Sequence, residues 1–100
     1  MLPEWRKEMQ SHRRLEGIDV SHWEGRIDFS EVRRDGIRIV YINASEGDRG
    51  VDPDFERNYR EAQTAGLKVG FYHYLTARTA EEGREQARHF AGVIREKQYE

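Results

Sequence analysis

Hydrophobic and polar positions follow two different periods along the chain. Short apolar runs cover residues 18–20, 37–42 and 67–75, and glycine or polar turn residues bound each of them, as they bound strands. Between these runs, apolar side chains recur at the spacing of a helix that buries one face. The pattern therefore predicts the order β-α-β-α-β-α.

The predicted helices carry recognisable start and stop signals. Each start has a capping residue followed by a supporting one: Asp28 with Glu31, Asp52 with Pro53 at the first helical position, and Thr79 with Glu82. Gly36 and Gly66 fit the left-handed position just past a helix end. These signals separate three helices from three strands, and the segment from Asn43 to Gly47 is expected to be a loop after the second strand.

Alternating strands and helices imply an α/β fold with a parallel sheet and right-handed crossovers. Sequential right-handed crossovers place every helix on the same face of the sheet, so the other face of a three-stranded sheet stays open. The two outer strand edges also stay unpaired. The predicted βαβαβα segment is therefore expected to be the first part of a larger sheet, or to associate with another copy through its edges.

Residues 1–16 form a polar extension ahead of this pattern. Basic and acidic side chains interleave there, which favours a solvated face over a phosphate-binding patch, and no apolar segment of a secretory signal is present. We therefore divide the chain into an extension, 1–16, and a domain portion, 17–100.

Composition narrows the function classes. The chain has 100 residues, enough for one domain, and 36% of them are charged against an average near 25%. Its formal net charge of −2 argues against a strongly basic nucleic-acid binder, and no apolar run is long enough for a membrane span. Without cysteine there is no disulfide, thiol nucleophile or Cys-ligated zinc, and the compartment stays open. No phosphate-binding glycine loop or Gly-x-Ser-x-Gly elbow occurs, so no cofactor is expected.

Chemistry-bearing residues gather where the predicted strands end, which is where βα folds place their sites. They are Asp19, Ser21, His22 and Trp23 after the first strand, Asn43, Ser45, Glu46 and Asp48 after the second, and Tyr72, His73, Tyr74 and Thr76 at the third.

Two carboxylates stand out in this group. Asp19 lies between Ile18 and Val20, so its side chain points to the face opposite these apolar neighbours. A carboxylate buried there needs partners, which makes Asp19 either a site residue or a structural residue bonded to loop groups. Glu46 precedes Gly47, whose tight turn aims the carboxylate at the strand ends or leaves it as an exposed loop residue.

The aromatic residues allow two interpretations. Tyr72 and Tyr74 share one face of the third strand and His73 lies on the other, while Trp23 follows the first strand. Such rings suit the faces of sugars, and they suit core packing equally well. A metal site is a further hypothesis, with His22, His73, Asp19 and Glu46 as the ligands. The spacing of these residues matches no dedicated ligand motif.

Several ordered segments resemble family 25 of the glycoside hydrolases, lysozymes of the N-acetylmuramidase type. The opening of that family resembles residues 17–23, GIDVSHW. Further similarity follows in order at 41–47 (YINASEG), 51–55 (VDPDF), 65–74 (AGLKVGFYHY) and 87–90 (ARHF). Asn43 and Ser45 stand where the family usually has Lys and Thr.

The resemblance implies an irregular, TIM-like β/α barrel that cleaves the β-1,4 bond between N-acetylmuramic acid and N-acetylglucosamine in peptidoglycan. Its action would be extracellular or at the cell wall, with glycan strands as the partner. By position, Asp19 and Glu46 match active-site carboxylates, and Trp23 and the segment Tyr72, His73, Tyr74 are expected to bind substrate.

The same resemblance places the acid catalyst in an Asp-x-Glu motif on a fourth strand, and no such motif follows the third strand here. Because glycoside hydrolysis normally uses a pair of carboxyl groups around the bond, the 100-residue chain alone is expected to be inactive. Two alternatives stay open: a non-catalytic glycan-binding module that uses Trp23, Tyr72 and Tyr74, and a metal-dependent hydrolase built on the two histidines.

Overall fold

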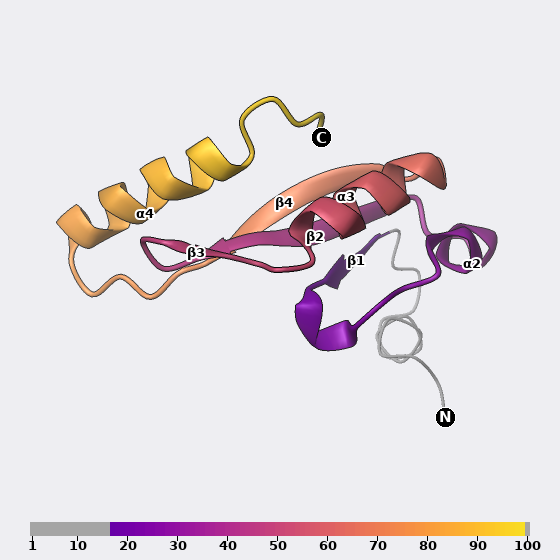
Figure 1. Ribbon diagram of the computed structural model, residues 1–100, viewed down its shortest axis with the longest axis horizontal. Helices are drawn as coiled ribbons and strands as arrows, with labels where there is room; N and C mark the ends of the chain where they lie inside the picture. The colour runs from indigo at the N-terminus through magenta and orange to yellow at the C-terminus, as the bar shows by residue number, and fades with distance from the viewer. Residues whose placement is uncertain (1–16, 100) are drawn as a thin grey trace.

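The structure, a computed structural model, describes residues 17–99; the polar extension predicted for 1–16 lies outside the described residues. The elements in chain order are β1 (Gly17–Val20), the 3₁₀ turn η1 (His22–Glu24), α2 (Phe29–Arg34), β2 (Ile39–Glu46), β3 (Gly50–Val51), α3 (Phe55–Thr64), β4 (Lys68–Tyr74) and α4 (Ala80–Val93) (Figure 1). The predicted alternation of strands and helices is confirmed, with η1 and β3 as additions.

Strand β2 forms the centre of the sheet. Strands β1 and β4 flank β2 and run parallel to it, as the alternation predicted. The short β3 pairs antiparallel with the last two residues of β2, which also pair with β4 on the other side. Strand β3 therefore continues the edge that β1 begins. Two residues are too short a run to give a sequence signal.

A single apolar core lies between the sheet and its helices. Every second side chain of the strands is buried on this face and meets apolar residues of α2 and α3: Ile18, Val20, Val40, Ile42, Ala44 and Val69 against Phe29, Val32, Phe55 and Ala62. On the other face Asp19 and Tyr41 are exposed. The helices thus cover one face, as expected, and among residues 17–99 no helix covers the second.

Most predicted helix signals act as expected. The carboxylate of Asp28 accepts from the backbone N–H of Glu31 at 3.1 Å, and the hydroxyl of Thr79 accepts from that of Glu82 at 3.1 Å. Gly36 has a φ of 96°, which an L-residue would adopt only with strain.

The predicted start of the second helix at Asp52 and Pro53 is wrong. Helix α3 begins at Phe55, and the Asp52 carboxylate does not cap it. One Asp52 oxygen accepts from the Asp54 backbone N–H at 2.8 Å, which makes a turn, and the other binds His22.

The second strand is longer than predicted. The expectation of a loop after residue 42 is wrong, because β2 continues through Asn43 to Glu46. The register with β4 passes from Asn43 opposite Tyr72 to Ser45 opposite His73, so Ala44 is an extra residue, a β-bulge. Strand β2 thus continues past the bulge through the polar residue Ser45, and Glu46 is the last residue of β2.

None of the helices in the described range is long and apolar enough to cross a membrane.

Candidate active site at the strand ends

Asp19 and Tyr72 lie on the uncovered face of the sheet. The Asp19 side chain alternates away from the buried Ile18 and Val20 and is exposed. The Tyr72 hydroxyl donates to the backbone carbonyl of Val20 at 3.3 Å, so its side chain spans from β4 to the end of β1. Burial, first, and then the negative charges of Asp19, Glu24 and Asp52 together raise the pKa of Tyr72 to about 12, while a hydrogen bond with Ser21 lowers it. The structure therefore brings the Asp19 carboxylate within electrostatic reach of a protonated phenol.

Asn43 connects this face to the end of β2. Its side-chain amide donates to the backbone carbonyls of Ser45 at 3.3 Å and Tyr72 at 3.5 Å. The residue is buried; one contact lies within β2 and the other reaches the backbone of β4. Asn43 thus places a neutral group that connects β2 to β4.

Glu46 lies on a pocket of about 380 Å³ at the end of β2. Its lining combines the three strand ends: His22, Asn43, Glu46, Gly47, Asp48, Arg49, Gly50, Val51, Asp52, Pro53 and Thr76. Asn43 belongs to this lining and is also the partner of Tyr72 in the sheet, so the pocket adjoins the Asp19 face. The structure thus places the two predicted carboxylates on adjoining surfaces rather than in one cavity.

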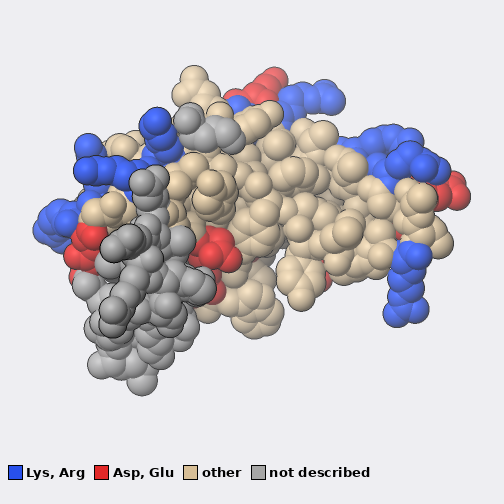
Figure 2. Space-filling model, turned by 180° about the vertical axis from the view of Figure 1, so that it is seen from behind, with Lys and Arg blue, Asp and Glu red and all other residues tan. Residues whose placement is uncertain are grey.

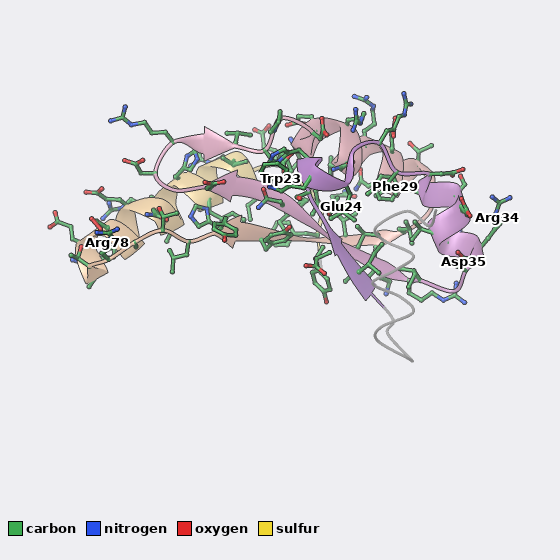
Figure 3. The ribbon with its side chains drawn as sticks, turned by 90° about the horizontal axis from the view of Figure 1, so that it is seen from below. Trp23, Glu24, Phe29, Arg34, Asp35 and Arg78 are labelled. Atoms are coloured by element: carbon green, nitrogen blue, oxygen red, sulfur yellow. The ribbon has the colours of Figure 1, made fainter. Side chains whose placement is uncertain are left out.

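Trp23 projects from an anchored turn. Ser21 and Glu24 cap η1 reciprocally, the Ser21 hydroxyl accepting from the Trp23 backbone and the Glu24 carboxylate from the Ser21 backbone. The indole is 81% exposed and packs against the ring of His22, with the ring centres 4.5 Å apart. Figure 3 shows Trp23 and Glu24 at the centre of the molecule, away from Arg34 at one end and Arg78 at the other.

Asp52 holds that turn in place. Its buried carboxylate accepts from the His22 backbone N–H at 2.9 Å, and the same oxygen lies 3.0 Å from the imidazole Nδ1. An Asp before Pro is a local signal for a helix cap, whereas the actual partner of Asp52, His22, is 30 residues away in the chain.

Tyr74 and His73 have opposite surroundings. Tyr74 pairs with Glu46 across the sheet and is 63% exposed at the strand ends. His73 faces the helices, as the alternation predicts. Its Nδ1 lies 2.7 Å from the Ser45 hydroxyl and its Nε2 2.9 Å from the side-chain oxygen of Gln86. The structure therefore does not bring His73 to the face that carries Tyr72 and Asp19.

Gln86 is the site-related residue that sequence reasoning missed. It is the buried residue of α4, four positions before Phe90 on the side of the helix that faces the sheet. A polar side chain at an apolar position of a helix period was the available signal.

Within residues 17–99, no group of three or more His, Asp or Glu side chains is arranged to hold a metal ion. The two histidines of the metal hypothesis bind Asp52 in one case and Ser45 with Gln86 in the other. The described residues thus give no ligand set for that alternative.

The chain matches known proteins along most of its length. The sequence model of the glycosyl hydrolases family 25 matches residues 18–100. The chain is 40% identical over 80 residues to an autolytic lysozyme of Clostridium acetobutylicum, covering 80% of this chain and 24% of that protein. It is 43% identical over 77 residues to lysozyme M1 of Streptomyces globisporus, covering 77% of this chain and 26% of that protein. The chain thus spans about a quarter of the length of these curated relatives.

A solved structure shares the fold. The chain superposes on a bacterial lysozyme from Streptomyces coelicolor with a TM-score of 0.70 and 41% identity. The superposition covers 78% of this chain and 36% of that one.

Proposed function

Because the chain belongs to family 25 of the glycosyl hydrolases, we propose that it carries the first part of a peptidoglycan-cleaving site of the N-acetylmuramidase type. The bond cut would be the β-1,4 bond between N-acetylmuramic acid and N-acetylglucosamine. The observation that carries this proposal is the position of Asp19 on the open face of the sheet, beside the protonated phenol of Tyr72. The parallel strands β1, β2 and β4 would form the first part of an irregular β/α barrel.

The proposed roles follow from the geometry. Asp19 would be a catalytic carboxylate beside the scissile glycosidic bond. Glu46 would contribute a second carboxylate from the adjoining pocket. The exposed rings of Trp23 and Tyr74 would stack on sugar faces. His73, behind the strand, receives no sugar contact in this proposal.

We propose that the 100-residue chain binds glycan without cleaving it. A general acid for glycoside hydrolysis needs a raised pKa, which an enclosed and partly apolar site supplies. In the described residues the Asp19 face is uncovered, and Glu46 is exposed as well. Hydrolysis would therefore belong to a protein of the length of its lysozyme relatives.

A sedimentation experiment with insoluble peptidoglycan tests the binding part. The chain is expected to pellet with the wall material, and Trp23→Ala is expected to remain in the supernatant. Tyr99→Ala is the matched control, because it removes another exposed aromatic ring, 54% exposed, that packs on Phe71 on the helix side. Failure of the unaltered chain to pellet would contradict the proposal.

Wall clearing tests the catalytic part. The chain alone should leave the turbidity of a wall suspension unchanged, whereas a version extended through a fourth strand with an Asp-x-Glu motif should clear it. Asp19→Asn in the extended version should abolish clearing. Full clearing by that variant would remove Asp19 from catalysis.

The second candidate function is a stand-alone glycan-binding module. The 81% exposure of Trp23 on a turn held by Asp52 favours it, because a rigid exposed indole is suited to sugar stacking. Wall binding without clearing in the extended version would select this function over the enzyme.

We also propose that copies of the chain associate through the outer strands of the sheet. In the described residues β1 and β4 each pair only with β2, so each leaves one row of backbone groups unpaired. The molar mass in sedimentation equilibrium is expected to rise with concentration. A mass that stays monomeric up to millimolar concentration would contradict this.

A further inference from the structure

The bulge in β2 lies directly before Glu46. Strand pairing with β4 passes from Asn43 to Ser45, so Ala44 has no partner residue in β4. A β-bulge changes the direction of the following side chains, and bulges are frequent beside active sites for this reason. The direction of Glu46 into its pocket therefore depends on this one irregular residue.

The bulge is held from both faces of the sheet. On the open face, the Asn43 amide donates to the Ser45 carbonyl. On the helix face, the fully buried Ser45 hydroxyl lies 2.7 Å from Nδ1 of His73. A buried hydroxyl with this partner fixes the residue that precedes Glu46.

Gln86 fixes His73 in turn. The side-chain oxygen of Gln86 accepts from the Thr76 backbone N–H at 3.1 Å, and Nε2 of His73 lies 2.9 Å from the same oxygen. Because a backbone N–H only donates, this atom of Gln86 must be the acceptor, and the His73 Nε2 must carry a proton. In the neutral ring Nδ1 is then the acceptor, and the Ser45 hydroxyl donates to it.

The same amide also reaches the pocket directly. The Gln86 side-chain nitrogen donates to the Thr76 hydroxyl at 3.1 Å, and Thr76 lines the pocket together with Glu46. Gln86 is the buried residue of α4, and its side chain hydrogen-bonds to His73 and Thr76, which lie at the end of β4. An apolar side chain would cost less free energy to bury at this position. The buried amide of Gln86 therefore serves to orient its hydrogen-bond partners as well as to fill space.

We propose that Gln86 is a positioning residue, which acts through His73 and Ser45 on the bulge of β2 and so aims Glu46 into the pocket. The role of Glu46 in this inference rests on the proposed function. The chain Gln86–His73–Ser45 itself does not, so the two are tested separately.

Imidazole ¹⁵N NMR tests the chain of hydrogen bonds. In the unaltered protein His73 is expected as the Nε2-protonated tautomer. Gln86→Leu should produce a mixture of tautomers, because Nε2 loses its acceptor, and should speed hydrogen exchange of the Glu46 amide about tenfold, the effect of one lost hydrogen bond. Gln63→Leu is the control, since it makes the same change at an exposed position of α3 and should alter neither.

Two variants at Ser45 test the next step and do not touch α4. Ser45→Ala removes the hydroxyl and should speed exchange at Glu46 as Gln86→Leu does. Ser45→Thr keeps a hydroxyl and should leave the His73 tautomer and the exchange rate near those of the unaltered protein. Gln86→Glu keeps the acceptor oxygen for His73 and should retain the tautomer. An unchanged tautomer and unchanged Glu46 exchange in both Gln86→Leu and Ser45→Ala would overturn the inference.

Ligand binding separates this inference from the proposed function. The probe is the tetrasaccharide of alternating N-acetylglucosamine and N-acetylmuramic acid, added to the full chain and followed by amide shifts. Gln86→Leu and Ser45→Ala are expected to weaken binding several-fold, and Ser45→Thr to restore it. If the unaltered protein shows the tautomer and protection but does not bind the probe, the proposed function is wrong and the positioning chain is still supported.

Discussion

The charge of Asp19 is expected to contribute to the raised pKa of Tyr72. Burial is the main cause of the raised pKa of Tyr72, and the charge of Asp19 is the next. Asp19→Asn removes that charge, so the pKa of Tyr72 should fall from about 12 but stay above its ordinary value. Ultraviolet absorbance titration, with Tyr72→Phe to identify the signal among five tyrosines, measures this.

Asp48→Asn is the control for that titration. Asp48 lines the Glu46 pocket but does not contribute to the Tyr72 shift. It should leave the titration of Tyr72 unchanged. An equal effect of Asp48→Asn and Asp19→Asn would mean that general charge, and not the position of Asp19, sets the pKa.

Residues within the apolar strand runs could be placed from the sequence, whereas residues with distant partners could not. Alternation alone put Asp19 opposite its apolar neighbours and His73 opposite Tyr72, because the period of a strand is fixed by its backbone. Asp52 and Gln86 were missed because their partners are distant in the chain, His22 by 30 residues and His73 by 13. No local pattern encodes such pairs.

At the scale of elements, the close packing of the three parallel strands depends on Gly70. A Cβ at this position would lie 2.7 Å from a ring carbon of Tyr41, which crosses the open face of the sheet. Gly70→Ala should therefore lower the free energy of unfolding by about 1–2 kcal/mol, as overpacking does. Urea unfolding measures the loss.

A double-mutant cycle provides the control for Gly70→Ala. In a Tyr41→Ala background the ring is absent, so the added methyl group should cost little or should stabilise the strand. A loss of equal size with and without the Tyr41 ring would show that backbone conformation, and not this contact, requires the glycine.

Two of the three helix starts and the strand cores could be predicted at this scale, whereas the start of α3 and the strand end that forms the pocket could not. The caps at Asp28 and Thr79 are local pairs that the sequence displays directly. The end of β2 depends on the bulge at Ala44 and on contacts from α4, so Asn43 to Glu46 look like a loop until the helix is in place. The three-residue η1 is likewise held by Asp52.

At the scale of the whole molecule, stability should fall in alkaline solution partly through Tyr72. Below about pH 10 the phenol is protonated in both the folded and the unfolded chain, so its raised pKa has no effect on unfolding. Between about pH 10 and 12 the unfolded chain loses this proton and the folded chain keeps it, which favours unfolding. Tyr72→Phe should lose less stability over that range than the unaltered chain in urea unfolding.

Charged side chains form several separate groups on the molecular surface rather than one continuous patch of a single sign. Seen from behind, Lys and Arg gather at both ends of the long axis, with acidic groups among them (Figure 2). The formal net charge of the whole chain is −2. The one-sided placement of helices was predictable, since right-handed crossovers dictate it.

The antiparallel β3 makes the two sides of the sheet unequal. On the β1 side of the sheet, the four residues of β1 run parallel to β2 and the two residues of β3 run antiparallel to it. A strand from another molecule therefore could not pair continuously along this side. The β4 side offers an unbroken stretch of seven residues. In a dimer paired through β4, the only free sheet edges would be the interrupted ones formed by β1 and β3. Such a closed twofold dimer would not add further copies by strand pairing, which works against fibre formation.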